Sequence, residues 1–291
     1  MKKAHLLLLI TLVLGSCFPK PEEDTWEFLG LEDKRVYRLV LADSYIYACA
    51  GINGLWRKNI SESNSEWQYL GMADSNLVNY PSRGVKDIIV NPENTNELLI
   101  VFDAVGYETP EVYRSLDSGE SWEAADSGLA FYVMDYKQYQ RIEKLCYSSD
   151  YILAGGSGVY KTYDFGLSWV PASNPQQIGA MECIMVRHQN ISDIVWFGGT
   201  TAISSVVLGS SIDGGNNWRI YENFGDNELN WGYISSIAIH PTDTNTVYIG
   251  IEDKLKKTTN GGNSWVYLYD SNLYSTSLLI DTENENHLWS S

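Results

Sequence analysis

The sequence predicts an all-β protein, a single β-propeller of about six four-stranded blades, and three observations support this fold class. A pattern of Ser or Thr, x, Asp, x, Gly, x, x, Trp recurs about every 48 residues. Short runs of β-branched and aromatic residues, bounded by turn residues, lie upstream of the copies. Hydrophobic residues make up 44% of the 291 residues, which is enough to build the core of a folded domain.

Four segments carry the motif. The matching residues are Ser115, Asp117, Gly119 and Trp122; Thr162, Asp164, Gly166 and Trp169; Ser211, Asp213, Gly215 and Trp218; and Thr258, Asn260, Gly262 and Trp265. We interpret the motif as the turn between the third and fourth strands of a blade. The Asp caps backbone N–H groups, the Gly provides a positive φ, and the Trp buries its ring while its N–H finds a partner. Asn260 is expected to cap less well than the Asp of the other copies.

The runs upstream of each motif predict the first two strands of each blade. In one repeat, 86–92 precedes 97–102, and in another, 235–241 precedes 246–250. With a degenerate copy that ends at Trp67, the repeats give five blades. Residues 25–29 resemble an isolated fourth strand, and 277–280 and 287–289 resemble the first two strands of a further blade. The last blade is therefore expected to be incomplete or closed by the N-terminal strand, which would hide both sheet edges.

The four motifs resemble Asp-boxes, and the chain resembles the Asp-box or BNR-repeat β-propellers. That group includes sialidases, xyloglucan-cleaving glycoside hydrolases, sortilin-type receptors and photosystem II assembly-factor-like propellers. The run 239–248, Ile-His-Pro-Thr-Asp-Thr-Asn-Thr-Val-Tyr, is especially similar to the last three. The resemblance extends over roughly residues 25–291, and it implies a fold without implying one function.

The N-terminus predicts export from the cytoplasm. Residues 1–16 combine a positive start with an apolar run that is too short to span a bilayer, as in a signal peptide. Gly15 and Ser16 before Cys17 resemble a bacterial lipobox, which implies lipidation of Cys17; ordinary cleavage beside an incidental Cys is the alternative. Residues 17–24 would then be a tether, and 25–291 the propeller. The acidic cluster at 20–24 resembles an export signal of surface lipoproteins, so we expect a lipid-anchored envelope protein, periplasmic or surface-exposed.

Charge and cysteine content exclude several classes. The formal net charge of −17 argues against nucleic-acid binding and against adsorption to anionic lipid, so contact with a membrane is expected through the lipid anchor only. Besides Cys17, the chain has Cys49, Cys146 and Cys183, an odd number in apolar segments, and we expect no disulfide. None of these cysteines has metal-ligand spacing, and we expect neither a metal nor a cofactor. His188 and His240 follow predicted first strands and are interpreted as turn residues.

The family resemblance implies that the motifs lie on the face away from the functional site. The loops after each fourth strand and between the second and third strands would then form the binding face. Their aromatic and charged residues suit stacking on sugars and equally suit a protein interface. The candidates are Tyr80, Arg83, Tyr132, Asp135, Tyr136, Arg141, Trp231 and Tyr233.

The sequence favours a monomeric, non-catalytic binding or assembly scaffold for another envelope protein. The alternative is a surface glycan-binding protein or a glycoside hydrolase, in which two loop carboxylates would face each other about 5–10 Å apart. A sialidase is less favoured, because it needs three convergent arginines and Arg35-Val-Tyr37 differs from the Arg-Ile-Pro signature of sialidases. A pocket that gathers Trp231, Tyr80 and Tyr132 beside paired acids would favour the glycan hypothesis, and a broad, shallow face would favour the scaffold.

Overall fold

The computed structural model describes most of the chain from residue 30 onward. The described residues are 30–74, 77, 79–80, 83–104, 109–133, 136–172, 182–200, 206–221, 232–251, 254–270, 277–281, 284–285 and 287–290, and the side chains of 131–133, 136, 182–183 and 269–270 are not among them. The expected signal peptide, Cys17, the tether and the expected strand 25–29 therefore lie outside the described residues.

The described residues form β-strands and no α-helix, and accordingly no helix among them is long and apolar enough to cross a membrane. The first two blades consist of β1 (Arg38–Ala42), β2 (Tyr45–Cys49), β3 (Leu55–Asn59) and β4 (Gln68–Tyr69), and of β5 (Gly84–Val90), β6 (Leu98–Asp103), β7 (Val112–Ser115) and β8 (Glu123–Ala124). A hairpin of β9 (Ala130–Val133) and β10 (Tyr136–Tyr139) follows. The third blade consists of β11 (Ile142–Tyr147), β12 (Ile152–Gly156), β13 (Val159–Thr162) and β14 (Val170–Pro171).

The C-terminal half repeats this arrangement. The fourth blade consists of β15 (Glu182–Arg187), β16 (Val195–Thr200), β17 (Val206–Ser211) and β18 (Arg219–Ile220), and the fifth of β19 (Ile234–Ile239), β20 (Val247–Ile251), β21 (Lys254–Thr258) and β22 (Val266–Asp270). The last two strands, β23 (Leu278–Ile280) and β24 (Leu288–Ser290), form a two-stranded sheet. They lie where the sequence predicted the start of a sixth blade.

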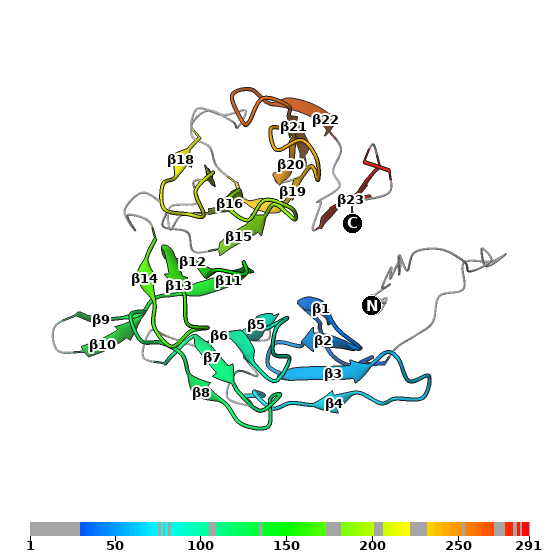
Figure 1. The fold of residues 1–291 in the computed structure, drawn as a ribbon, viewed down its shortest axis with the longest axis vertical. Helices are drawn as coiled ribbons and strands as arrows, with labels where there is room; N and C mark the ends of the chain where they lie inside the picture. Colours follow the sequence, from blue (N-terminus) through cyan, green and yellow to red (C-terminus); the bar gives the residue numbers. More distant parts are fainter. Residues whose placement is uncertain are drawn as a thin grey trace.

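The blades are arranged as a ring (Figure 1). Each four-stranded sheet pairs its strands antiparallel in chain order, as in β5-β6-β7-β8. The first strands β1, β5, β11, β15, β19 and β23 lie toward the centre and contact one another in succession, whereas the fourth strands lie at the periphery. The predicted all-β propeller architecture is confirmed, with five four-stranded blades and a partial sixth among the described residues.

The hydrophobic core lies between the blades rather than within them. Each of five buried clusters takes side chains from two successive blades; the first joins Tyr47 and Leu55 to Ile88 and Leu98, and the last joins Tyr248 to Ile280. A single blade therefore buries its apolar surface only when its neighbour is present. Burying such side chains stabilises the fold by about 1.5–3 kcal/mol each.

The motif turns are held by a repeated set of hydrogen bonds. In the second blade, Ser115 Oγ donates to Asp117 Oδ1 (2.7 Å) and accepts from the N–H of Gly119 (2.8 Å). Asp117 Oδ1 also accepts from the N–H of Ser121 (2.9 Å), and Ser121 Oγ donates to Asp117 Oδ2 (2.5 Å). The hydrogen bonds from Ser121 lower the pKa of Asp117 to about 2. This confirms the expected capping role of the motif Asp.

The other copies reproduce this geometry with one variation. Asp164 bonds to Thr162 and Ser168, and Asp213 bonds to Ser211 and Asn217, at matching positions. In the fifth blade, Asn260 accepts from Thr258 and from the N–H of Ser264, but its amide donates to Ser264 Oγ (2.8 Å) instead of accepting from it. Asn260 thus replaces the Asp by reversing one hydrogen bond.

Each motif glycine lies against the preceding blade or its own second strand. Gly166 has φ +86°, and a Cβ added there would lie 2.7 Å from Leu99 Cδ1 of the second blade. Gly262 has φ +81°, and its added Cβ would lie 2.4 Å from the ring of Tyr221 in the fourth blade. Glycine is therefore required both for backbone conformation and for close approach of neighbouring blades.

The motif tryptophans differ in their hydrogen bonds. Trp122 Nε1 donates to the carbonyl of Leu70, and Trp169 Nε1 to that of Ala125, each at 2.9 Å and each in the preceding blade. Trp218 Nε1 instead donates to Gly215 in its own turn (2.9 Å). The buried N–H of Trp265 has no partner among the described residues. The expectation that each Trp N–H finds a partner is thus correct for three copies and wrong for the fourth.

The histidine and cysteine interpretations agree with the described side chains. His188 Nδ1 accepts from the N–H of Ile191 (3.1 Å), and its Nε2 lies 3.0 Å from the carbonyl of His240 in the next blade, so His188 orders its turn. Cys49 and Cys146 are buried and form no disulfide. The side chain of Cys183 lies outside the described residues.

We predict that Gly166→Ala destabilises the chain by roughly 1–3 kcal/mol, because the new Cβ meets Leu99 and the backbone has a positive φ. Thermal unfolding should show a midpoint several degrees lower. Leu167→Ala, at a 55% exposed position in the same turn, is the control and should change stability by less than about 0.5 kcal/mol. Equal midpoints for the two variants would contradict a close inter-blade contact at this glycine.

Candidate binding face

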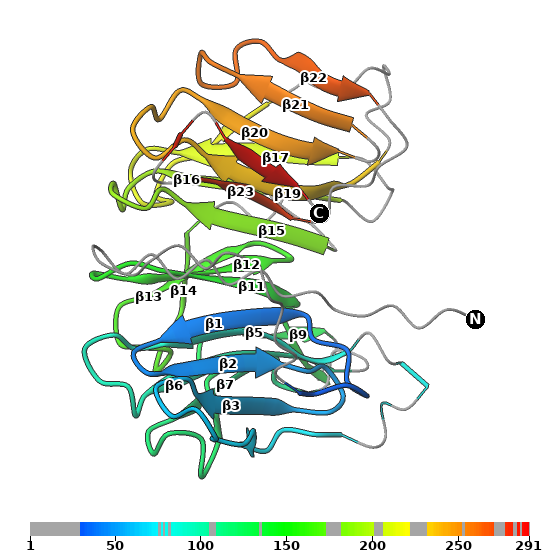
Figure 2. The same cartoon turned by 90° about the vertical axis from the view of Figure 1, so that its right-hand side faces the viewer.

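The ring has two faces, which we name the motif face and the loop face. The motif turns lie beside the turns that join first and second strands, as shown by hydrogen bonds from Ser118 to Asn96 (2.8 Å) and from Gly261 to Asn245 (3.0 Å). These turns form the motif face. The connections between second and third strands and between blades form the loop face. In Figure 2 the strands run across the view, and the turn between β21 and β22 marks the motif face at the left.

Three of the predicted binding residues come together on the loop face, between the first three blades. Tyr80 and Arg83 lie on the connection from β4 to β5, and Arg141 immediately precedes β11. Tyr233 immediately precedes β19, two blades farther around the ring. Asp135, Trp231 and the side chains of Tyr132 and Tyr136 lie outside the described residues, so their expected convergence with Tyr80 is untested.

Asp103 connects the cations of this region. Its buried carboxylate lies 2.8 Å from Arg83 Nη1, 3.3 Å from Lys86 Nζ and 3.6 Å from Arg141 Nη2. These groups come from two neighbouring blades, which Asp103 thereby joins electrostatically. All three cationic side chains remain partly exposed, so they can also contact a ligand. The Arg35 guanidinium lies 4.9 Å from the centroid of the Tyr37 ring, and Lys86 Nζ lies 5.4 Å from the same centroid. Arg35 is therefore a further cation in this region.

Two glutamates complete this charged cluster. Glu143 Oε1 accepts from Arg141 Nε (2.6 Å), and burial raises the Glu143 pKa. Glu111 is buried, and its Oε2 accepts from the N–H of Ile142 (2.7 Å). Burial raises the pKa of Glu111 to about 8, so this carboxyl is largely protonated at neutral pH. The local charge is therefore positive on a chain that is negative as a whole.

A hollow of about 570 Å³ adjoins the cluster. Its wall is mainly apolar and aromatic and includes Met72, Leu77, Tyr80, Phe102 and Tyr113. The Phe102 and Tyr113 rings meet edge to face, with centroids 6.0 Å apart. The hollow and the cluster share Ala104, which lines the hollow and whose carbonyl accepts a hydrogen bond from Arg83 Nη1. The Arg83 guanidinium also lies 5.7 Å from the centroid of the Tyr80 ring, which is 47% exposed.

A second carboxylate holds further cations nearer the centre of the ring. Asp87 on β5 is buried, lies 3.1 Å from Arg38 Nε and 4.0 Å from Lys144 Nζ, and accepts from the N–H of Leu145 (3.0 Å). It joins the first strands of three blades. Arg38 therefore pairs with Asp87 and does not join Arg83 and Arg141 at Asp103.

Several residues of this region are not among those that the sequence predicted. Lys86, Glu111 and Glu143 belong to the charged cluster, and Met72, Phe102 and Tyr113 line the hollow. An acidic residue within a largely buried strand gives a partial signal, because Glu143 lies in Ile142–Tyr147. Their convergence depends on which blades are neighbours. Among the described residues, no three His, Cys, Asp or Glu side chains gather as metal ligands.

Comparisons with known proteins establish the fold. A comparison with protein families found no match, and a comparison with curated proteins also found none. Among solved structures, the chain is similar to an ancestral GH74 enzyme, with a TM-score of 0.61 and 15% identity over 87% of this chain and 34% of that one. The chain thus spans about a third of the length of that enzyme.

Two further similar structures are both of YCF48. YCF48 from Cyanidioschyzon merolae has a TM-score of 0.60 and 11% identity, covering 92% of this chain and 82% of that chain. YCF48 bound to a D1 peptide has a TM-score of 0.55 and 15% identity, covering 92% and 80%. At these identities the likenesses show the β-propeller fold alone.

We predict that the free energy of unfolding falls less with rising pH in the Glu111→Gln variant than in the wild-type chain. The folded chain keeps the Glu111 proton to about pH 8, whereas the unfolded chain releases it near pH 4.5. This stabilisation is complete below about pH 4.5 and falls as the pH rises to 8, by at most about 1.4 kcal/mol for each pH unit. Gln can accept the same hydrogen bond from Ile142 and does not titrate. Urea unfolding between about pH 5 and pH 8 measures the difference.

The exposed Glu120→Gln is the matched control and should follow the wild-type chain at every pH. The same fall in stability for Glu111→Gln and the wild type would show that Glu111 is ionised in the folded chain.

Proposed function

We propose that the chain is a lipid-anchored propeller of the bacterial cell envelope that binds a segment of another envelope protein on its loop face. The observation that carries this proposal is the apolar hollow beside partly exposed cations, built by the first three blades. An apolar side chain of the partner would enter the hollow beside Tyr80. An acidic side chain or terminal carboxylate would meet Arg83, Lys86 and Arg141, which suit charge-assisted hydrogen bonds.

The state of the acidic residues favours binding over hydrolysis. A retaining or inverting glycosidase needs two accessible carboxyl groups that flank a sugar bond. Asp103 and Glu143 instead pair with cations, and Glu111 is buried against a backbone N–H. Asp103 and Glu111 join the second blade to the third, and Glu143 pairs with Arg141 within the third blade. The proposed function is therefore non-catalytic, and a glycan-binding or glycan-cleaving role on this face is the alternative.

The comparisons support the proposal only by analogy. One similar propeller, YCF48, is known in a complex with a D1 peptide, so this fold is compatible with peptide binding. Another is a GH74 enzyme, of which this chain spans about a third. The proposed envelope location rests on the resemblance of residues 1–17 to a signal peptide that ends at a lipidated Cys17. The Asp-box resemblance similarly rests on the four motif turns.

The proposed function predicts that the Tyr80→Ala variant binds the partner protein much more weakly than the wild-type chain does. The tagged full-length chain is cross-linked in its native membrane, and the captured proteins are quantified by mass spectrometry. We expect a recurrent partner in amounts comparable to the bait, and roughly fivefold or greater loss with Tyr80→Ala, because an aromatic side chain at an interface hollow often contributes 1 kcal/mol or more. Tyr163→Ala, at a 67% exposed position on the motif face, should capture the partner normally.

Failure to capture any recurrent protein with a well-labelled bait would overturn the proposal and favour the glycan alternative. Equal capture by Tyr80→Ala and the wild type would place the interface elsewhere.

A further inference from the structure

The first described residues belong to a repeat of the segment that ends the first blade. Residues 26–33 read Trp-Glu-Phe-Leu-Gly-Leu-Glu-Asp, and residues 67–74 read Trp-Gln-Tyr-Leu-Gly-Met-Ala-Asp. The two segments share the Trp, the Leu, the Gly and the final Asp, with similar side chains at two further positions. Residues 67–74 contain the fourth strand β4 and the start of the connection to the second blade. Residues 26–29 lie outside the described residues, whereas 30–33 can be compared directly.

The backbone at Gly30 and Leu31 has the same conformation as the backbone at Gly71 and Met72. The φ angles are +104° and +63° in the first pair and +91° and +63° in the second. A positive φ is uncommon at a Leu or a Met, so its occurrence at matched positions of the repeat shows that the two turns are equivalent.

Both glycines also lie against the Trp of the next motif along the chain. A Cβ added at Gly71 would lie 3.6 Å from Trp122 Nε1, and a Cβ added at Gly30 would lie 3.2 Å from Trp67 Nε1. Gly71 follows the fourth strand of the first blade, and Trp122 belongs to the second blade. By the same relation, Gly30 follows the position of a fourth strand in the blade that precedes the first.

The blade that precedes the first in the ring is the one that contains β23 and β24 (Figure 1). Its second strand is poorly covered, because Trp289 of β24 is 53% exposed, whereas β2, β6 and β12 are almost entirely buried. This last blade therefore has an apolar surface that further strands would cover.

We propose that residues 26–29 form the fourth strand of the last blade, so that this blade combines segments from the two halves of the chain. The fourth strands of the described blades follow the motif turns and lead into the connections between blades, so they run from the motif face to the loop face. A strand at 26–29 that continues into Gly30 runs in the same direction. The chain before it, including the expected tether 17–24, therefore enters the ring on the motif face.

This path sets the orientation of the propeller at the membrane, and that step rests on the lipid anchor of the proposed function. The tether of eight residues reaches at most about 29 Å when it is fully extended. A ring held by this tether at its motif face presents the loop face, with the hollow beside Tyr80, away from the lipid. The partner on the loop face is then an extramembrane segment of a protein and not a membrane-embedded one.

The position of the strand is tested by thermal unfolding of the full chain. Leu29 corresponds to Leu70, which is 4% exposed and whose carbonyl accepts from Trp122 Nε1 (2.9 Å). We expect Leu29→Ala to lower the unfolding midpoint by several degrees, as Leu70→Ala should, because each removes a buried side chain between two blades. Glu27→Ala is the matched control, since Glu27 corresponds to the exposed Gln68, and it should unfold as the wild type does. Equal midpoints for Leu29→Ala and the wild type would overturn the strand.

The orientation is tested by energy transfer between the lipidated chain and vesicles of zwitterionic phospholipid that contain an acceptor dye. A donor dye is attached at Ile212→Cys, which is 81% exposed on the motif face, or at Tyr80→Cys on the loop face. We expect more transfer from position 212 than from position 80. Equal transfer from both positions, or more transfer from position 80, would overturn the orientation.

These outcomes are distinguishable from a failure of the proposed function. A chain that does not associate with the vesicles would overturn the lipid anchor, and the orientation with it, whereas the unfolding of Leu29→Ala needs no membrane. A loop face that captures no protein would overturn the proposed function and would leave both measurements of this subsection as expected.

Discussion

The structure depends on the close packing of each motif turn against the blade before it. Five clusters of buried side chains lie between successive blades, so no described blade carries a complete core of its own. The motif carboxylate fixes a turn in which glycine has a positive φ, and that turn lies within contact distance of its neighbour. We name the contact between two successive blades a seam. The stability of the fold thus depends on the seams, as in other repeat proteins in which each unit contacts mainly its neighbours.

This constraint acts mainly on the motif face. The hydrogen bonds that fix the seams lie mostly on the motif face, whereas the connections on the loop face vary in length and composition. Asp103 and Asp87 are exceptions, because they join blades near the loop face and the ring centre through buried ion pairs. Such pairs contribute little net stability compared with apolar packing. They do hold cations at fixed positions where a partner can reach them.

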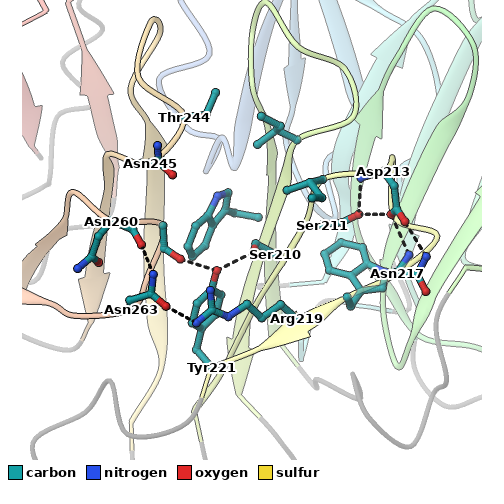
Figure 3. Close-up of a pocket in the computed structure, with 15 residues that line it drawn as sticks. Ser210, Ser211, Asp213, Asn217, Arg219, Tyr221, Thr244, Asn245, Asn260 and Asn263 are labelled. Carbon is teal, nitrogen blue, oxygen red and sulfur yellow. Dashed lines mark hydrogen bonds between the residues drawn. The ribbon is translucent and has the colours of Figure 1, made fainter.

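The seam between the fourth and fifth blades shows what happens when the motif changes. Tyr221 takes the position that Leu70 and Ala125 hold after earlier motifs, and its ring extends toward the next blade. Trp265 does not form the inter-blade hydrogen bond that Trp122 and Trp169 form. A hollow lined by aromatic rings and amides lies at this seam (Figure 3).

Local patterns in the sequence were enough to predict the turns, the blade order and strands as short as Leu278–Ile280. They could not predict the charged cluster, because Arg83, Asp103 and Arg141 meet only through the register of β5, β6 and β11. The residue before each motif Trp was also overlooked, although Ser121, Ser168 and Asn217 all donate to the motif Asp and share that chemistry. The N–H of Trp265 has no partner among the described residues, which depends on tertiary packing and has no local signal.

The most direct measurement of the central claim is site-specific photo-cross-linking in the native membrane. A photo-reactive phenylalanine analogue is placed at position Tyr80, beside the loop-face hollow, or at position Leu167, which is 55% exposed on the motif face. The account predicts a discrete protein adduct from position 80 and none from position 167. Adducts of equal yield from both positions, or an adduct from position 167 alone, would contradict a protein-binding loop face.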